Sequence, residues 1–377
     1  MKRKIICFAL CLTAVLVSAC DKKEDTKITT KTTTNDVVAE IITATTTTVA
    51  TTTTPETTTT PVTTPEPEPE PMGEYNNLTG EMTLSSEAVG KRPVAVMVNN
   101  ITYSLPQYGT YDADIMYECL VEGGITRLMA VYSDYTAVPD VCSIRSCRYY
   151  YPMLAMGHDA IYFHYGLDKT VAAETLDRLD TDHFDGGYWS DAFPVDKDRL
   201  NDYSREHTIF LDGDKIPKLI KNRGMRIDLS EEYNKSAFKF KDEASQIGGK
   251  SCVEAEIDFS YAYYSTFKYN EENGTYVKFH NGEKHMDSRA EKQLEYTNIF
   301  CLETTTEIIN TKNNLISVDL EGGRGYYISK GEIVAINWSR ETETSPILFT
   351  DTDGNELEVN PGKSYIGFAP KNKLTYK

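Results

Sequence analysis

The chain has 377 residues, 40% of them hydrophobic, and this length suggests about two domains of roughly 100–200 residues each. It carries 39 Lys and Arg against 57 Asp and Glu, a formal net charge of −18. An acidic surface repels phosphate and gains nothing from counterion release, so the charge argues against a nucleic-acid partner and against attraction to anionic lipids. The 25 Tyr, 13 Phe and 2 Trp supply enough apolar material for a core.

The first 20 residues have the pattern of an export signal. Residues 2–4 are basic, and residues 5–17 form an apolar run that is too short for a spanning helix, which needs roughly 17–25 residues. The run ends in Val-Ser-Ala before Cys20, which resembles the lipobox of bacterial lipoproteins. We expect residues 1–19 to be a signal peptide, and a diacylglyceryl group on Cys20 to anchor the protein to the outer face of the bacterial cytoplasmic membrane. The alternative is an ordinary secretory signal with an incidental Cys.

A low-complexity segment follows the signal. Residues 29–64 contain 20 Thr in 36 positions, and residues 65–71 alternate Pro with Glu. Such a segment has no apolar periodicity with which to offset the entropy lost on ordering. We therefore predict that residues 20–87 are the lipidated Cys and a disordered Thr/Pro/Glu-rich linker that separates the membrane from a folded head. Loss of the signal leaves 36 basic against 57 acidic residues, a net charge of −21.

Residues 88–232 alternate short apolar runs with helical patterns, which predicts a mixed α/β domain. We expect buried strands at residues 92–100, 114–121, 127–133, 160–165 and 207–211. Helices are expected at residues 146–156, 168–180 and 215–223. Asp168 or Thr170 can cap the second helix, and Gly224 ends the third.

Residues 250–377 predict an antiparallel, β-rich domain, because short strands alternate with turn signals such as Asn281-Gly282. In the first strand, Val253, Ala255, Ile257 and Phe259 alternate with acidic residues and are expected to face the core. The strands are expected at residues 253–259, 263–269, 275–279, 297–302, 315–320, 324–329, 332–338, 346–350, 356–359 and 364–368. The predicted fold class is α+β, with a mixed α/β domain followed by this β-rich domain.

Several motifs of the head occur together in one known family. They are Arg-Pro-Val-Ala-Val-Met-Val-Asn-Asn at residues 92–100, Ser-Ile-Arg-Ser-Cys-Arg at residues 143–148, and the stretches 111–118, 121–127, 322–326 and 338–340. With these motifs the chain resembles the YerB-like family of bacterial lipoproteins, which pairs an N-terminal and a C-terminal domain of unknown function. The resemblance covers nearly the whole head and implies this two-domain architecture, but it implies no particular reaction.

The strongest local feature of the head is a group of arginines. Planar guanidinium groups bind carboxylates and phosphates through two hydrogen bonds, so an Arg cluster in an acidic head suggests an anion site. Alternatively, Glu118 or Glu122 pairs with Arg127 or Arg145 only to hold the loops together. The candidate binding residues are Arg127, Arg145, Arg148, Glu118, Glu122 and His164.

The sequence assigns no catalytic residue, metal or cofactor. There is no G-x-S-x-G sequence. His158 with its neighbour Asp159, and His164, are not accompanied by a further metal ligand at motif spacing. The five cysteines of the head, Cys119, Cys142, Cys147, Cys252 and Cys301, are expected to be buried and unpaired, although Cys142 and Cys147 could pair.

We interpret the protein as a binding module at the cell envelope, with a cell-wall polymer or an envelope protein as its partner. The alternative is an envelope enzyme or ligand-binding protein that acts through the Arg cluster on an anionic cell-wall glycan or a lipid-linked precursor.

Overall fold

The computed structural model describes residues 73–233 and 238–377, which contain 27 strands and three α-helices. The predicted signal peptide, Cys20 and most of the predicted linker lie outside the described residues. Residues 73–87, which we expected in the disordered linker, instead contain two short strands at Glu74–Tyr75 and Met82–Leu84, so the folded head begins earlier than predicted. Strands dominate the described part, so the α+β fold is richer in β-structure than the helical patterns of the first half suggested.

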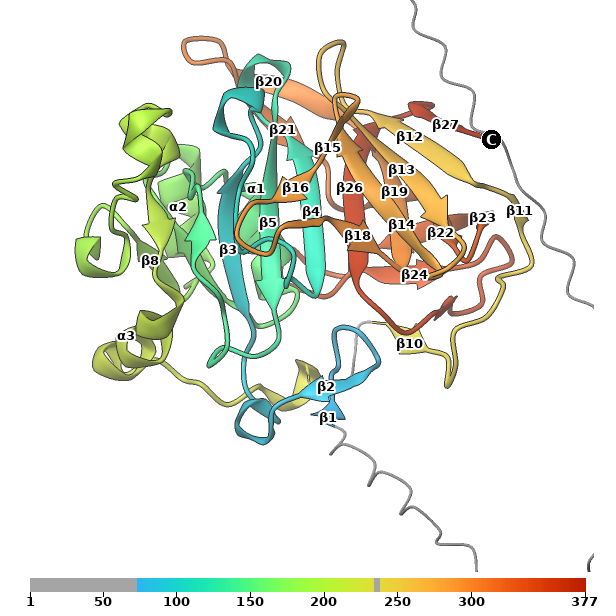
Figure 1. The fold of residues 1–377 in the computed structure, drawn as a ribbon, viewed down its shortest axis with the longest axis horizontal. Helices are drawn as coiled ribbons and strands as arrows, with labels where there is room; N and C mark the ends of the chain where they lie inside the picture. The colour runs from blue at the N-terminus through green and yellow to red at the C-terminus, as the bar shows by residue number, and fades with distance from the viewer. Residues whose placement is uncertain (1–72, 234–237) are drawn as a thin grey trace, which may run out of the picture. The chain divides into compact units, whose positions relative to one another are not determined.

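One continuous sheet of eleven strands runs through both halves of the head (Figure 1). Along the sheet the order is β8 (His183–Asp185), β7 (Ile161–His164), β3 (Val94–Asn99), β5 (Thr126–Tyr132), β4 (Ile115–Leu120), β26 (Ser364–Pro370), β19 (Asn298–Thr304), β22 (Gly322–Ser329), β23 (Glu332–Ser339) and β11 (Lys250–Ser251). The eleventh strand, β24 (Leu348–Thr350), also pairs with β23.

The two halves join where β26 lies between β4 and β19, and in Figure 1 the red β26 stands beside the cyan β4. Both pairings are parallel, so the expectation of a purely antiparallel C-terminal domain was wrong. The physical reason is that β26 returns to the sheet after a long excursion instead of following a hairpin, and a long connection permits parallel pairing.

A smaller antiparallel sheet covers one face of the main sheet. It contains β12 (Glu254–Asp258), β13 (Tyr264–Asn270), β14 (Thr275–His280), β15 (Glu283–Lys284), β18 (Glu295–Tyr296) and β27 (Leu374–Tyr376). Val96 and Met116 of the main sheet share a core with Ile257 and Phe267 of the smaller sheet. Alternate residues of the same main-sheet strands face the other way and pack with the helix α1 (Tyr150–Met156).

The other two helices agree with the sequence analysis in type and place. In α2 (Val171–Arg178) the N-cap residue is Thr170, and the carboxylate of Asp168, two residues before it, accepts a hydrogen bond of 2.8 Å from the backbone N–H of Val171. Helix α3 (Ile216–Arg223) ends at Gly224, whose φ of 65° is the left-handed conformation that glycine adopts without strain. Helix α1 begins at Tyr150 and not at residue 146, because residues 143–147 are extended.

The remaining elements are short. The other strands are β1 (Glu74–Tyr75), β2 (Met82–Leu84), β6 (Val141–Cys142), β9 (Phe210–Leu211), β10 (Lys239–Phe240), β16 (Met286–Asp287), β17 (Lys292–Gln293), β20 (Thr306–Asn310), β21 (Leu315–Val318) and β25 (Glu358–Val359). The 3-10 helices are η1 (Ser86–Ala88), η2 (Thr102–Ser104), η3 (Glu122–Gly124), η4 (Ser190–Ala192), η5 (Arg199–Asn201), η6 (Arg205–His207), η7 (Gly213–Lys215) and η8 (Glu231–Tyr233). Val253, which we expected in the core, is 46% exposed and lies in a bend just before β12 begins.

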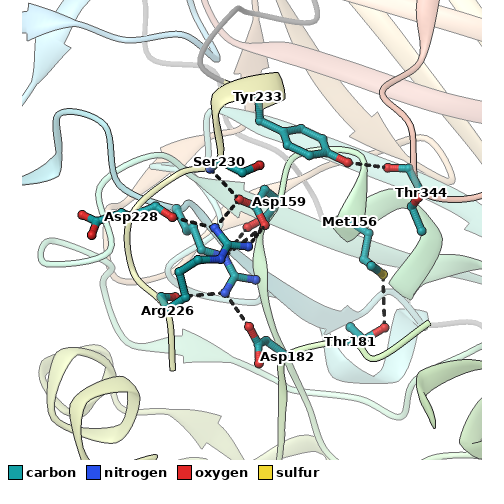
Figure 2. Close-up of polar contacts among 10 residues, drawn as sticks. Met156, Asp159, Thr181, Asp182, Arg226, Asp228, Ser230, Tyr233 and Thr344 are labelled. Atoms are coloured by element: carbon teal, nitrogen blue, oxygen red, sulfur yellow. Dashed lines mark hydrogen bonds and ion pairs between the residues drawn. The ribbon is translucent and has the colours of Figure 1, made fainter. Parts of the chain in front are cut away.

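A cluster of four charged residues connects distant segments of the first half of the head (Figure 2). We call Arg92, Asp159, Asp182 and Arg226 the Asp159 cluster. Both carboxylate oxygens of Asp159 accept hydrogen bonds from Arg226, at 2.6 and 2.7 Å. The buried Arg92 donates to the backbone oxygen of Asp159 and to the carboxylate of Asp182. The two arginines thus neutralise the two aspartates, so we interpret this cluster as one that stabilises the fold and does not bind a charged ligand.

Candidate functional site

Strands β3, β4, β7 and β8 all run in the same direction, because β3 and β4 are both antiparallel to β5 while β7 and β8 continue the parallel order. Their carboxyl ends therefore meet at one edge of the sheet, which is the usual place for ligands in sheets of this kind. We call this the carboxyl edge and define it by the loops 100–105, 121–125, 165–170 and 186–191 and the segment 143–148.

The segment 143–148 lies between β3 and β7 where these strands separate. Strand β7 pairs only with Val94–Val96 of β3. Beyond that point the N–H of Arg145 donates to the backbone oxygen of Met97 at 3.1 Å, and the N–H of Tyr165 donates to that of Arg145 at 3.0 Å. The inserted segment thereby places Arg145 and Arg148 at the carboxyl edge.

The three predicted arginines lie together but have different partners. Arg148 donates two hydrogen bonds to Glu122, at 2.5 and 2.7 Å, and the partly exposed Arg145 pairs with Glu206 at 3.0 Å. Arg127 is buried and donates to the backbone oxygen of Ser146 at 2.7 Å, and it forms no ion pair with any carboxylate in the described part of the chain. Burial, together with the neighbouring Arg148, lowers the pKa of Arg127 to about 10.

His164 belongs to the same edge and makes a pair that the sequence analysis missed. Its Nδ1 donates to the backbone oxygen of Gly166 at 2.9 Å, so its Nε2 accepts the hydrogen of His183 Nδ1, also at 2.9 Å. Burial lowers the pKa of both imidazoles, that of His164 to about 4, and both are therefore neutral at pH 7. His183 and Asp185 occur two residues apart in the sequence, a spacing that puts both on one face of a strand.

Exposed tyrosines surround this edge. Tyr103 follows β3 and is 81% exposed, and Tyr188 follows β8 and is 86% exposed. Tyr261, which is 98% exposed, lies in a turn whose Ser260 hydroxyl donates to the backbone oxygen of Gly124 at 2.6 Å. Aromatic rings left in solvent at the edge where the arginines lie are surfaces on which sugar rings or side chains can stack.

Glu118 lies apart from the arginines, because its side chain points into the space between the two sheets. One of its oxygens accepts hydrogen bonds from Asn100 at 2.9 Å and Thr126 at 2.7 Å. The other accepts from Ser265 at 3.0 Å and Tyr365 at 2.7 Å. The ammonium of Lys278, also completely buried, lies 3.3 Å from this second oxygen. We call Asn100, Glu118, Thr126, Ser265, Lys278 and Tyr365 the Glu118 cluster.

Lys278 and Glu118 each oppose the effect of burial on the pKa of the other. Burial alone would raise the pKa of Glu118, but Lys278 and the hydrogen bonds hold it below its ordinary value. Burial lowers the pKa of Lys278, and the nearby carboxylate of Glu118 offsets part of this decrease. The Lys278 ammonium also donates to His285 at 3.0 Å, and that imidazole donates to Gln107 at 2.7 Å. These contacts link residues from both halves of the chain, and no sequence pattern predicted the pairing of Glu118 with Lys278.

The comparisons with known proteins agree with the motifs quoted above. The family described as "Protein of unknown function (DUF3048)" matches with its N-terminal domain at residues 78–226 and with its C-terminal domain at residues 255–366. The chain belongs to the YerB-like, DUF3048 family. A Bacillus subtilis (strain 168) protein that carries the name of a lipoprotein, YerB, is 28% identical over 306 residues, which are 78% of this chain and 85% of that protein. The crystal structure of YerB from Bacillus subtilis matches with a TM-score of 0.70 and 25% identity, over 80% of this chain and 99% of that chain.

In terms of the DUF3048 family, the Glu118 cluster joins its two domains, since Glu118 lies in the N-terminal match and Lys278 in the C-terminal match.

All five cysteines of this YerB-like head are buried and unpaired, as expected, and Cys142 and Cys147 form no disulfide. Burial raises the pKa of Cys147 to about 12, which makes it a poor nucleophile. Within residues 73–233 and 238–377 no helix is long and apolar enough to cross a membrane, and no three acidic, His or Cys side chains are arranged to hold a metal ion.

The buried histidines of the YerB-like head predict a loss of stability in acid. Burial lowers the pKa of His158, His164 and His280 to about 4 each, below the value of roughly 6.5 in an unfolded chain. Between these values the unfolded chain binds protons that the fold does not, so the free energy of unfolding falls as the pH drops from 6.5 towards 4, by up to about 1.4 kcal/mol per pH unit for each histidine. Urea denaturation at a series of pH values measures this slope. His158→Gln should make it shallower, and an unchanged free energy between pH 6.5 and 4.5 would contradict the prediction.

Proposed function

We propose that this YerB-like protein is a lipid-anchored envelope protein whose carboxyl edge binds a cell-wall polymer or an envelope protein. The lipobox-like sequence before Cys20 supports the anchor, and so does the name of the Bacillus subtilis relative. The low-complexity segment between Cys20 and the head supports a role as a spacer that carries the head away from the membrane.

One observation carries the proposal for the carboxyl edge: arginines and exposed tyrosines occupy the same edge of the sheet. Arg145 reaches solvent beside the buried Arg127, which has no carboxylate partner among the described residues. A polymer with carboxylate or phosphate groups would pair with Arg145, and its sugar rings would stack on Tyr188 or Tyr261. The net charge of −21 without the signal peptide repels such a polymer from the rest of the protein, so binding would be confined to this edge.

The alternative is an enzyme that acts on an anionic wall glycan, and the His164–His183 pair is the observation that favours it. Because Nδ1 of the neutral His183 donates to His164, its Nε2 carries no proton and can act as a base. His183 is only partly buried, so this nitrogen is close to solvent at the carboxyl edge.

The proposal is tested in two steps with the full chain produced in a bacterial host. Cell fractionation should place the wild type in the membrane and Cys20→Ala in the soluble fraction. The soluble form is then mixed with isolated cell walls, where Arg145→Ala combined with Tyr261→Ala should weaken retention about tenfold, the equivalent of about 1.4 kcal/mol. Arg178→Ala, which removes an exposed and paired arginine outside the carboxyl edge, is the matched control.

Equal retention of the double variant and the wild type would contradict binding at the carboxyl edge. Membrane retention of the Cys20→Ala variant would contradict the lipid anchor. If the wild type releases soluble wall fragments and His183→Ala does not, the enzyme alternative would replace the proposed binding function.

A further inference from the structure

One stretch of β23 in the main sheet is paired on one side only. On that side β22 pairs along the whole strand. On the other side, β11 pairs with Glu332 and Ile333, and β24 pairs with Asn337–Ser339. Residues 334–336 lie between these two neighbours and face no strand of residues 73–233 and 238–377 on that side, so within the described chain the edge of the sheet is open for the length of three residues.

The backbone of Ala335 points into this opening. In an antiparallel ladder the peptide groups of successive residues point to opposite sides of the strand. The backbone oxygen of Gly331 accepts from Cys252 at 2.7 Å on the open side, and on that side Ile333 lies opposite Lys250 and Asn337 opposite Thr350. Every second residue from Gly331 to Asn337 therefore faces the same way, and the N–H and C=O of Ala335 are directed at the gap.

A groove of about 880 Å³ lies over this part of β23, at Ile333, Val334 and Ala335. Val334 and the exposed Ala335 contribute to its lining, and so do the aromatic rings of Tyr326 and Tyr376. Gly248–Lys250 and the turn at 351–356 also line the groove. The groove is lined by three lysines and three acidic residues, so it has no dominant charge.

We propose that this groove binds an extended, uncharged segment of a partner protein, which adds a short strand to β23 at Ala335. Natural proteins usually pair, cover or charge such an open edge, and an uncovered one is a template for a further strand. Main-chain hydrogen bonds to Ala335 would supply the register, and side chains of the segment would contact Tyr326 and Tyr376. The groove shares no lining residue with the carboxyl edge, so this inference is independent of the proposed function.

The test uses the full chain purified in detergent and the neutral, strand-forming peptide acetyl-Thr-Val-Thr-Val-Thr-amide as the probe. Residue-resolved hydrogen exchange should show that the amide of Ala335 exchanges faster than those of Val334 and Ile336 in the free protein. Saturating peptide should slow the exchange of Ala335 about tenfold and leave its two neighbours unchanged, because their amides already pair with β22.

Two variants, each with a matched control, make the test specific. Ala335→Pro removes the N–H that faces the gap and keeps the pairing with β22, so peptide binding should weaken about tenfold, whereas Ala335→Ser keeps this N–H and should bind as the wild type does. Tyr376→Ala tests the aromatic wall in case the proline variant does not fold, with an expected loss of about fivefold. Tyr75→Ala is its control, because these two tyrosines are similarly exposed, at 47% and 41%.

The proposal is overturned if the peptide does not protect the Ala335 amide, or if the folded Ala335→Pro and Tyr376→Ala variants bind it as tightly as the wild type. A dimer that forms without peptide and protects the same amide would also overturn it, because a second copy of the chain would then be the occupant.

Discussion

Glu118→Gln is expected to lower the free energy of unfolding by about 3 kcal/mol, because it leaves the buried ammonium of Lys278 without its counter-charge. Both side chains are completely shielded from solvent, so water cannot replace the lost partner. Gln can still accept hydrogen bonds from Asn100 and Thr126 through its one oxygen. Its NH2 group replaces the oxygen that accepts from Ser265 and Tyr365, so these two hydrogen bonds are lost together with the charge. Equilibrium urea denaturation measures the change, and an unchanged slope would show that the unfolded state is unaffected.

The matched control removes both charges at once. Glu118→Gln combined with Lys278→Met should recover most of the lost stability, because replacing a buried ion pair by uncharged groups of similar volume is often neutral. A double variant that is as unstable as the sum of the two single variants would contradict a direct interaction between these residues. A Glu118→Gln protein as stable as the wild type would show that Lys278 is neutral in the fold.

Asp159→Ala is expected to cost about 3 kcal/mol, because it leaves two guanidinium groups of the Asp159 cluster facing each other without their shared carboxylate. Arg92 is buried and cannot turn to solvent, although Asp182 would still balance it in part. Arg226 would lose both of its hydrogen bonds to the carboxylate, which Figure 2 shows. The loss of stability is measured by thermal and urea unfolding of the same protein.

Asp228→Ala is the control for this prediction. Asp228 lies in the same region but its side chain is 75% exposed, and it forms an ion pair with the partly exposed Lys91. Its removal should leave the unfolding midpoint unchanged, because exposed ion pairs contribute little. Equal effects of Asp159→Ala and Asp228→Ala would contradict a special role for the buried cluster.

The local elements could be predicted because their causes are local. The apolar run at residues 115–120 predicts a buried strand, and the capping carboxylate of Asp168 together with Gly224 marks ends of helices that the structure confirms. The strand at 275–280 shows the limit of this reasoning. Val277 and Phe279 alternate with Lys278 and His280, yet it is Lys278 and His280 that face the buried side.

The candidate site was predicted only in part for a similar reason. Arg127, Arg145 and Arg148 are near one another in the sequence, and they are also near one another in the fold. Glu118 is equally near in sequence, but as a strand residue it points to the face of the sheet that the C-terminal half covers. His183 was missed because its hydrogen bond with His164 depends on the parallel pairing of β7 with β8, and no local sequence pattern predicts that pairing.

The opening figures of 377 residues and −18 combine a basic N-terminal segment, which we predict to be an export signal, with an acidic chain behind it, and the sequence by itself distinguished these parts. It also determined the family, most strands and helices and the Arg cluster, since each of these rests on neighbouring residues. Only the tertiary structure decided that the two halves share one sheet, that Glu118 pairs with Lys278 and that the edge at Ala335 stays open. These features depend on strand order and register between distant segments, and such pairings follow from the packing of the whole chain.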